Sequence, residues 1–129
     1  MYKKAIAAVF VAAVAFLFSC EYKKWPDPKE QVILPDQVSF SGHIMPLFNS
    51  YCNAAGCHAG SAPAGNLDLT AAHAYAQLFQ RHEVDTVNVN SSVLYIELAS
   101  GAMPQGAARL SDYNISLVQK WIQQKAKNN

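Results

Sequence analysis

The sequence predicts an all-α domain of about four helices joined by long loops. Apolar residues in the segments expected to be helical recur at steps of three and four, which places them on one helical face. Serine or threonine precedes three of these segments, as expected for residues that cap a helix N-terminus. Stretches rich in glycine and proline separate them. At 129 residues, the chain has room for a single core.

The N-terminal region is not expected to belong to that core. Two lysines precede an uninterrupted run of fourteen apolar residues, 5–18, which is typical of a secretory signal and shorter than the roughly twenty residues of a membrane-spanning helix. The run ends in the sequence LFSC, which resembles the lipobox of bacterial lipoproteins. We therefore expect residues 1–19 to be a lipoprotein signal peptide and Cys20 to be lipidated. The alternative is an ordinary signal peptide.

Residues 20–38 are expected to form a lipid anchor and a flexible tether, because the segment is charged and interrupted by three prolines. The folded domain is expected to cover 39–129. The chain carries ten basic and nine acidic residues, and two of the basic residues lie in the signal. No basic cluster is present, so the sequence predicts no nucleic-acid partner.

The first helix is expected to lead directly into Cys52. Its apolar residues share one face. They are Phe40, Ile44, Leu47, Phe48 and Tyr51. Pro46 complicates this helix, because its ring would press on the carbonyl of Gly42. Either the helix bends there or its regular part begins at about Pro46.

A second helix is expected over 71–80, with Thr70 as its N-cap. The segments 59–66 and 100–109 are rich in small residues, glycine and proline, which predicts loops. The polar segment 81–90 contains scattered valines that could form a strand, but a loop is the preferred interpretation.

Two further helices follow. Ser91 or Ser92 can cap a short helix that includes Leu94 and Leu98. Ser111 is expected to cap the last helix, over 112–126, whose apolar stripe faces the core and whose lysines suit a helix C-terminus.

The most informative motif is CNAAGCH, in which Cys52 and Cys57 enclose four residues and His58 follows directly. Two thiols at such positions can add to the vinyl groups of a haem, and the following histidine can bind the iron as proximal ligand. The usual spacer has two residues. The longer spacer here consists of small residues, and Gly56 is permissive enough in backbone angle to let the loop turn outward. The motif predicts one covalent haem c.

The other axial position of the iron is assigned to Met103. Pro104 favours an extended backbone at Met103, and the neighbouring residues are small. The alternatives are His73 or His82, or an open site. Methionine ligation raises the reduction potential relative to two imidazoles, and an iron with two protein ligands is closed to substrate. Together with the absence of any recognisable catalytic motif, this predicts an electron carrier and no enzyme.

In several short segments the chain resembles the class I cytochrome c superfamily, and most closely the small monohaem, membrane-associated domains of planctomycete and Bacteroidota type. The matching segments are PLF at 46–48, CH at 57–58, NLDL at 66–69, SVLY at 92–95, MP at 103–104, LSD at 110–112 and WI at 121–122. The resemblance implies a cytochrome c-like fold wrapped around one haem, which Cys52 and Cys57 hold covalently. His58 and Met103 are its implied iron ligands.

The resemblance also implies that Phe48 and Trp121 help the first and last helices to pack, and that the Pro63 carbonyl accepts a hydrogen bond from the proximal imidazole. Separately, Tyr95 and Arg109 are candidates to bind the haem propionates. The chain departs from the family pattern in its long cysteine spacer and in Gln105, where many relatives have a second proline.

The leading hypothesis is therefore a lipoprotein that transfers electrons to redox partner proteins at the membrane surface. It would lie in the cell envelope of a bacterium, lipid-anchored and facing the periplasm or the exterior. The alternative is a haem-free lipoprotein binding module with a Cys52–Cys57 disulfide. A zinc site ranks third, because adjacent Cys57 and His58 cannot easily reach one tetrahedral ion.

Overall fold

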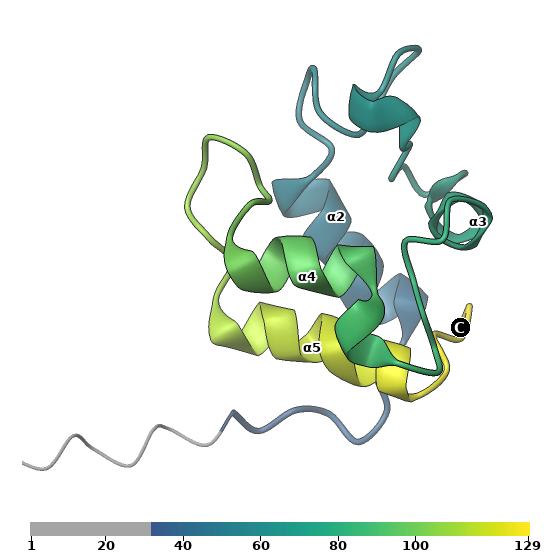
Figure 1. The fold of residues 1–129 in the computed structure, drawn as a ribbon, viewed down its shortest axis with the longest axis vertical. Coiled ribbons are helices and arrows are strands. Elements are labelled where there is room, and N and C mark those ends of the chain that lie inside the picture. The colour runs from purple at the N-terminus through teal and green to yellow at the C-terminus, as the bar shows by residue number, and fades with distance from the viewer. Residues whose placement is uncertain (1–31) are drawn as a thin grey trace, which may run out of the picture. The chain divides into compact units, whose positions relative to one another are not determined.

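The computed structural model describes residues 32–129, so the expected signal peptide, Cys20 and most of the tether lie outside the described residues. Four α-helices and no strand occur in the described part, which confirms the all-α prediction (Figure 1). The α-helices are α2 (Met45–Tyr51), α3 (Ala74–Gln80), α4 (Val93–Ser100) and α5 (Asp112–Gln123). Three short segments accompany them: the π-helical η1 (Phe40–Ile44) and the 3₁₀ turns η2 (Ala64–Asn66) and η3 (Val89–Ser91).

The first helix is divided at the proline. η1 has wide turns, in which the Ser39 carbonyl accepts from the Ile44 N–H at 3.4 Å, and α2 then begins at Met45. Pro46 thus occupies the first turn of α2, where its missing N–H has no intrahelical partner to lose. The second of the two sequence alternatives is therefore confirmed: the regular helix starts at the proline.

The helix α3 begins later than the expected residue 71. The Thr70 carbonyl accepts from the N–H groups of His73 and Ala74 at 3.0 and 2.8 Å, which closes a turn before the helix. Thr70 does not cap α3, because His73 occupies the N-cap position and its side chain makes no capping bond. The Asp68 carboxylate instead accepts from the Thr70 N–H at 2.8 Å and so holds this turn.

Ser92 lies at the N-cap position of α4, but its side chain does not cap the helix. Its hydroxyl accepts from the Asp85 N–H at 2.8 Å and donates to the Asp85 carbonyl at 3.1 Å. The buried Ser92 thus ties the 81–90 loop to the start of α4. That loop carries no strand, as the sequence predicted.

The helix α5 has the predicted cap, since Ser111 Oγ accepts from the Asn114 N–H at 3.2 Å. It ends at Gln123, three residues before the expected end. Lys125 and Ala126 have positive φ angles, which stop the helix and turn Ala126 back into the core.

The core lies between η1, α2, α4 and α5, and Figure 1 shows α4 and α5 side by side. Phe48 and Trp121 are both fully buried. Phe40 contacts both rings, at centroid distances of 6.3 Å to Phe48 and 5.3 Å to Trp121. The indole N–H of Trp121 donates to the Lys127 carbonyl at 2.9 Å.

The two ends of the described chain are joined. The Gln124 side chain accepts from the Val38 N–H at 2.9 Å and donates to the Asp36 carbonyl at 2.6 Å. The Asn129 carbonyl accepts from the Ser41 N–H at 2.8 Å. The buried Val38 thus already belongs to the core. Between residues 32 and 129, no helix has the length and apolar character needed to cross a membrane.

Candidate functional site

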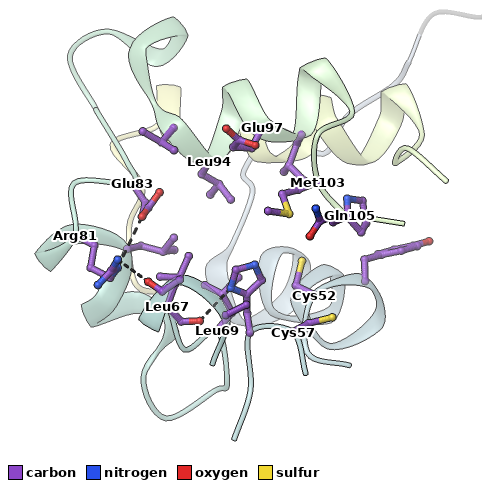
Figure 2. Close-up of a pocket in the computed structure, with 18 of the residues that line it drawn as sticks. Cys52, Cys57, Leu67, Leu69, Arg81, Glu83, Leu94, Glu97, Met103 and Gln105 are labelled. Atoms are coloured by element: carbon purple, nitrogen blue, oxygen red, sulfur yellow. Dashed lines mark hydrogen bonds and ion pairs between the residues drawn. The ribbon is translucent and has the colours of Figure 1, made fainter. Parts of the chain in front are cut away.

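One cavity brings together the four residues that the sequence predicted to hold a haem. Cys52, Cys57, His58 and Met103 all line this cavity, whose volume is about 420 Å³. In Figure 2, Met103 lies above Cys52 and Cys57. Met103 is distant from the other three along the sequence, so only the tertiary fold could bring it to them.

The four-residue spacer between the cysteines forms a closed loop. Cys52 follows directly on the last residue of α2. Its carbonyl accepts from the His58 N–H at 3.0 Å, and the Ala54 carbonyl accepts from the Cys57 N–H at 2.9 Å. Gly56 has a φ of +80°, which suits glycine. The loop therefore returns the second cysteine and the histidine to the end of α2.

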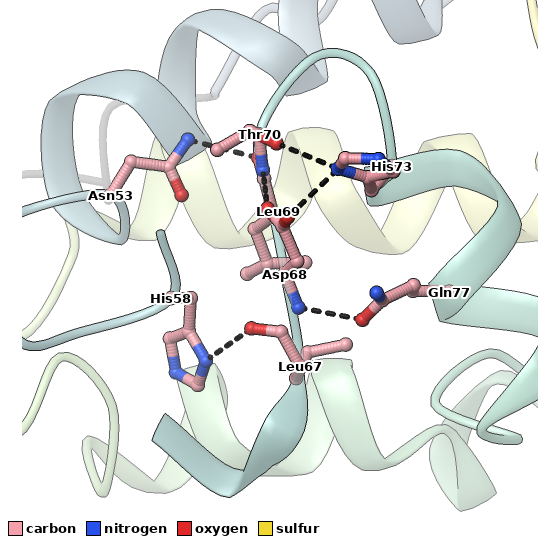
Figure 3. A network of polar contacts seen from close by, with 8 residues as sticks. All are labelled: Asn53, His58, Leu67, Asp68, Leu69, Thr70, His73 and Gln77. Carbon is pink, nitrogen blue, oxygen red and sulfur yellow. Dashed lines mark hydrogen bonds and ion pairs between the residues drawn. The ribbon is translucent and has the colours of Figure 1, made fainter. Parts of the chain in front are cut away.

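The His58 imidazole is oriented by a backbone carbonyl (Figure 3). Its Nδ1 lies 3.1 Å from the Leu67 carbonyl oxygen. Because a carbonyl can only accept, Nδ1 donates in this contact, and in the neutral imidazole this leaves the Nε2 lone pair available to a metal. The predicted role of the Pro63 carbonyl is wrong: that oxygen accepts from the Asn66 N–H at 2.9 Å within the turn η2.

The two cysteines are free thiols, and no disulfide joins them. Burial raises the pKa of the Cys52 thiol to about 11, with a smaller contribution from nearby Cys57. At neutral pH, Cys52 is therefore an uncharged thiol at the wall of an apolar cavity.

Met103 reaches the cavity through the turn after α4. Gly101 ends this helix with a φ of +78°, and the Met103 N–H then donates to the Glu97 carbonyl at 3.1 Å. A Cβ at position 101 would lie 3.3 Å from Cδ of Arg109 as well as in a strained backbone conformation. The turn therefore fixes Met103 at the cavity, where it is partly buried against the core.

The alternative ligands lie elsewhere. Neither His73 nor His82 is among the residues that line this cavity. His73 Nδ1 lies 2.8 Å from the Asp68 carboxylate, and the exposed His82 follows the end of α3. Of the candidates for the second axial position, Met103 is thus the residue that faces the cavity.

Three charged residues that sequence reasoning missed also line the cavity: Glu97 of α4, Arg81 and Glu83. Arg81 donates to the Gly65 carbonyl at 2.7 Å, and its Nε lies 3.9 Å from the carboxylate of Glu83 (Figure 2). Both come from the irregular 81–90 loop, where no periodicity or motif marked them. Tyr95 and Arg109, the candidates for the haem propionates, do not line this cavity, and Arg109 pairs with Asp112 at 2.8 Å.

Within residues 32–129, no three side chains of His, Cys, Asp or Glu gather as a metal-binding group. The cysteines and His58 are thus not arranged around one common ion. Comparisons of the chain with protein-family models, with curated proteins and with solved structures find no match.

Proposed function

We propose that the protein is a one-electron carrier that holds one covalently attached haem c in this cavity. The observation that carries the proposal is that a C-x4-C-H motif and a methionine distant from it in the sequence line the same cavity. A disulfide or an isolated thiol pair would not require that methionine. A haem whose iron is held by two protein side chains would use this methionine together with His58.

The residues of the cavity suit a haem. The volume of about 420 Å³ lies within the range of small-molecule and cofactor sites. Five leucines form apolar walls for a porphyrin. They are Leu67, Leu69, Leu78, Leu94 and Leu98. Arg81 supplies a guanidinium at the cavity wall, which is suited to a propionate carboxylate.

Each residue of the proposed site has a defined role. The thiols of Cys52 and Cys57 would each add across a vinyl group: a carbon–sulfur bond forms, and the thiol proton goes to the adjacent vinyl carbon. This addition needs no oxidant or reductant. His58 Nε2 and the Met103 thioether would bind the iron, and this pair leaves no coordination position for a substrate. When bound, the haem supplies an iron that gains and loses one electron.

The cellular setting of the proposal rests on the sequence. Lipidation at Cys20 would hold the domain at a bacterial membrane, facing the periplasm or the exterior, where redox partner proteins would exchange electrons with it. The iron would react by outer-sphere transfer, and we propose no enzymatic activity.

The test is expression of the full chain in a bacterium with a working c-type haem maturation system. We expect a mass gain of one haem that persists after denaturation, and an absorption spectrum that changes between the oxidised and reduced protein. A double variant, Cys52→Ala with Cys57→Ala, is the control and should carry no covalent haem.

The proposal fails if the wild-type chain from this host holds no covalent haem. A mass two hydrogens below that of the dithiol would then favour the alternative, a haem-free lipoprotein binding module with a Cys52–Cys57 disulfide.

A further inference from the structure

A short extended segment, Leu67–Leu69, is bound to the cysteine motif at three points. The Leu67 carbonyl accepts from His58 Nδ1 at 3.1 Å. The Leu69 N–H donates to the His58 carbonyl at 2.8 Å, and the Leu69 carbonyl accepts from Asn53 Nδ2 at 2.9 Å (Figure 3). Leu69 is therefore held through both of its backbone groups, one at each end of the cysteine spacer.

The Asn53 side chain supplies one of these attachments. Its Nδ2 also donates to Asn49 Oδ1 at 3.2 Å. Both partners are oxygen acceptors, so the orientation of the amide is determined: the nitrogen faces Leu69 and Asn49. Asn53 is the first residue of the spacer, and its bond to Leu69 bridges sixteen positions of the chain.

The carbonyl oxygen of the Asn53 side chain accepts no hydrogen bond from the described residues. Asn53 Oδ1 is buried and has no hydrogen-bond partner within the described residues. A buried acceptor without a partner destabilises the fold, whereas an apolar side chain of the same shape would avoid that cost. The favourable contribution of Asn53 therefore lies in its Nδ2 donor, which holds the Leu69 carbonyl.

We propose that Asn53 is a positioning residue for the proximal histidine: by fixing Leu69, it holds the Leu67 carbonyl in place to orient the His58 imidazole. This inference rests on the proposed haem function. The residue is part of the unusually long cysteine spacer, so the spacer itself orients the ligand that follows it.

The expected consequence is electronic as well as structural. A carbonyl that accepts firmly from Nδ1–H makes Nε2 more basic, and a more basic ligand favours ferric iron. If Asn53 no longer holds Leu69, the Leu67 carbonyl becomes less well fixed and the Nδ1–H bond weakens. The reduction potential of the holoprotein should then rise.

The first experiment compares the haem-loaded full chain with its Asn53→Ala variant. We expect covalent haem in both, and a shift of the ferric–ferrous equilibrium toward ferrous iron in the variant of up to about tenfold, which is 59 mV for a one-electron couple. Asn49→Ala is the matched control. It removes only the exposed second bond of Nδ2 and should leave the potential unchanged.

The second experiment uses the haem-free full chain and is independent of the haem. In the wild type, nitrogen NMR should show His58 protonated at Nδ1 when neutral, and the Leu69 amide hydrogen should exchange slowly. In Asn53→Ala the preference of the neutral His58 imidazole for the Nδ1–H tautomer should weaken, giving a mixture of the Nδ1–H and Nε2–H forms, and the Leu69 amide should exchange at least tenfold faster. Asn49→Ala should resemble the wild type.

Asn53→Leu covers the case in which the alanine variant fails to fold. It keeps the approximate shape of the side chain, removes the unpaired Oδ1 and lacks the donor, so it should show the same shifts. Unchanged potential, tautomer and amide exchange in both variants would overturn the inference. If no chain, including the wild type, attaches haem while the tautomer and exchange still change, the proposed function fails and the positioning role stands.

Discussion

Met103 and Cys52 face the same cavity, but burial affects their chemistry differently. A thioether carries no charge, so it keeps its lone pairs for a metal whatever the surroundings. A thiol must ionise to become a strong nucleophile, and the burial of Cys52 opposes this by raising its pKa to about 11. At the residue scale, the site therefore combines a ligand that is ready to bind with a thiol held in its neutral form.

Replacing Met103 by alanine should remove the second axial ligand of the proposed haem. We expect the low-spin spectrum and the far-red sulfur-to-iron band to disappear, and the reduction potential to fall by on the order of 100 mV, because axial ligands set potentials over about 0.8 V. Absorption spectroscopy and a redox titration provide the measurement.

The matched control for Met103 is Met45→Leu, a volume-conserving change of a buried methionine in α2 that does not line the cavity. It should cost less than about 1.5 kcal/mol of stability and leave the far-red band in place. A spectrum of Met103→Ala identical to that of the wild type would exclude Met103 as a ligand.

The raised pKa of Cys52 predicts slow alkylation in the haem-free chain. Between the ordinary value of 9.0 and the value of about 11, the thiolate fraction at neutral pH falls by roughly a hundredfold. The rate of iodoacetamide labelling at Cys52, followed by peptide mass mapping, should be at least about tenfold lower in the folded chain than in denaturant.

The same shift affects stability at high pH. The unfolded thiol ionises first, so the contribution of Cys52 to stability is complete below pH 9.0 and is lost as the pH rises toward about 11. The labelling rate should rise over the same interval. Equal labelling rates in the folded and denatured chains at neutral pH would contradict this assignment.

At the scale of secondary-structure elements, a serine or threonine before a helix was a reliable sign of an N-cap only where its hydroxyl had no competing partner. Ser111 caps α5 as predicted, because its hydroxyl finds the N–H of Asn114 three residues later. Thr70 and Ser92 also precede helices, but Thr70 does not cap α3 and the Ser92 hydroxyl binds Asp85 instead. The sequence shows where a hydroxyl can act, but not which of two neighbouring backbone segments it will reach.

Ser92→Ala should therefore destabilise the loop more than the helix. We expect a loss of about 1–3 kcal/mol in the free energy of unfolding, since the Asp85 N–H and C=O both lose a buried partner. Hydrogen exchange of the Asp85 amide should accelerate, while the amides of α4 keep their relative protection. Its exposed neighbour provides the control: Ser91→Ala should change stability by no more than about 0.5 kcal/mol. The assignment is wrong if the two variants behave alike.

At the scale of the whole molecule, the predicted haem-binding residues came together, but much of their surroundings was not predictable. The cysteines and His58 were identified by spacing, and Met103 by its neighbour Pro104. The acceptor for His58 is a backbone carbonyl, which any residue could provide, so the sequence carried no signal for Leu67. Arg81 and Glu83 reach the cavity only through the path of an irregular loop.

The aromatic core is expected to dominate the stability of the domain. Trp121 is fully buried, contacts Phe40 and donates to the Lys127 carbonyl. Trp121→Ala should cost about 3–5 kcal/mol in urea unfolding followed by circular dichroism, a large share of the 5–15 kcal/mol typical of a small domain. Trp121→Phe keeps an aromatic ring and should cost clearly less. A loss below about 1 kcal/mol for the alanine variant would show that this core position is unimportant.

Hydrogen bonds join residues 36–41 to residues 124–129. They bear on how the domain could be linked to another domain or to a surface. Both ends of the described chain are fixed to each other by Gln124 and Asn129, and none of these residues lines the cavity. A spacer, a fused domain or a surface linkage entering at either end would therefore pull on the same small region. Mechanical load applied there would act first on η1 and α5, the elements next to these hydrogen bonds.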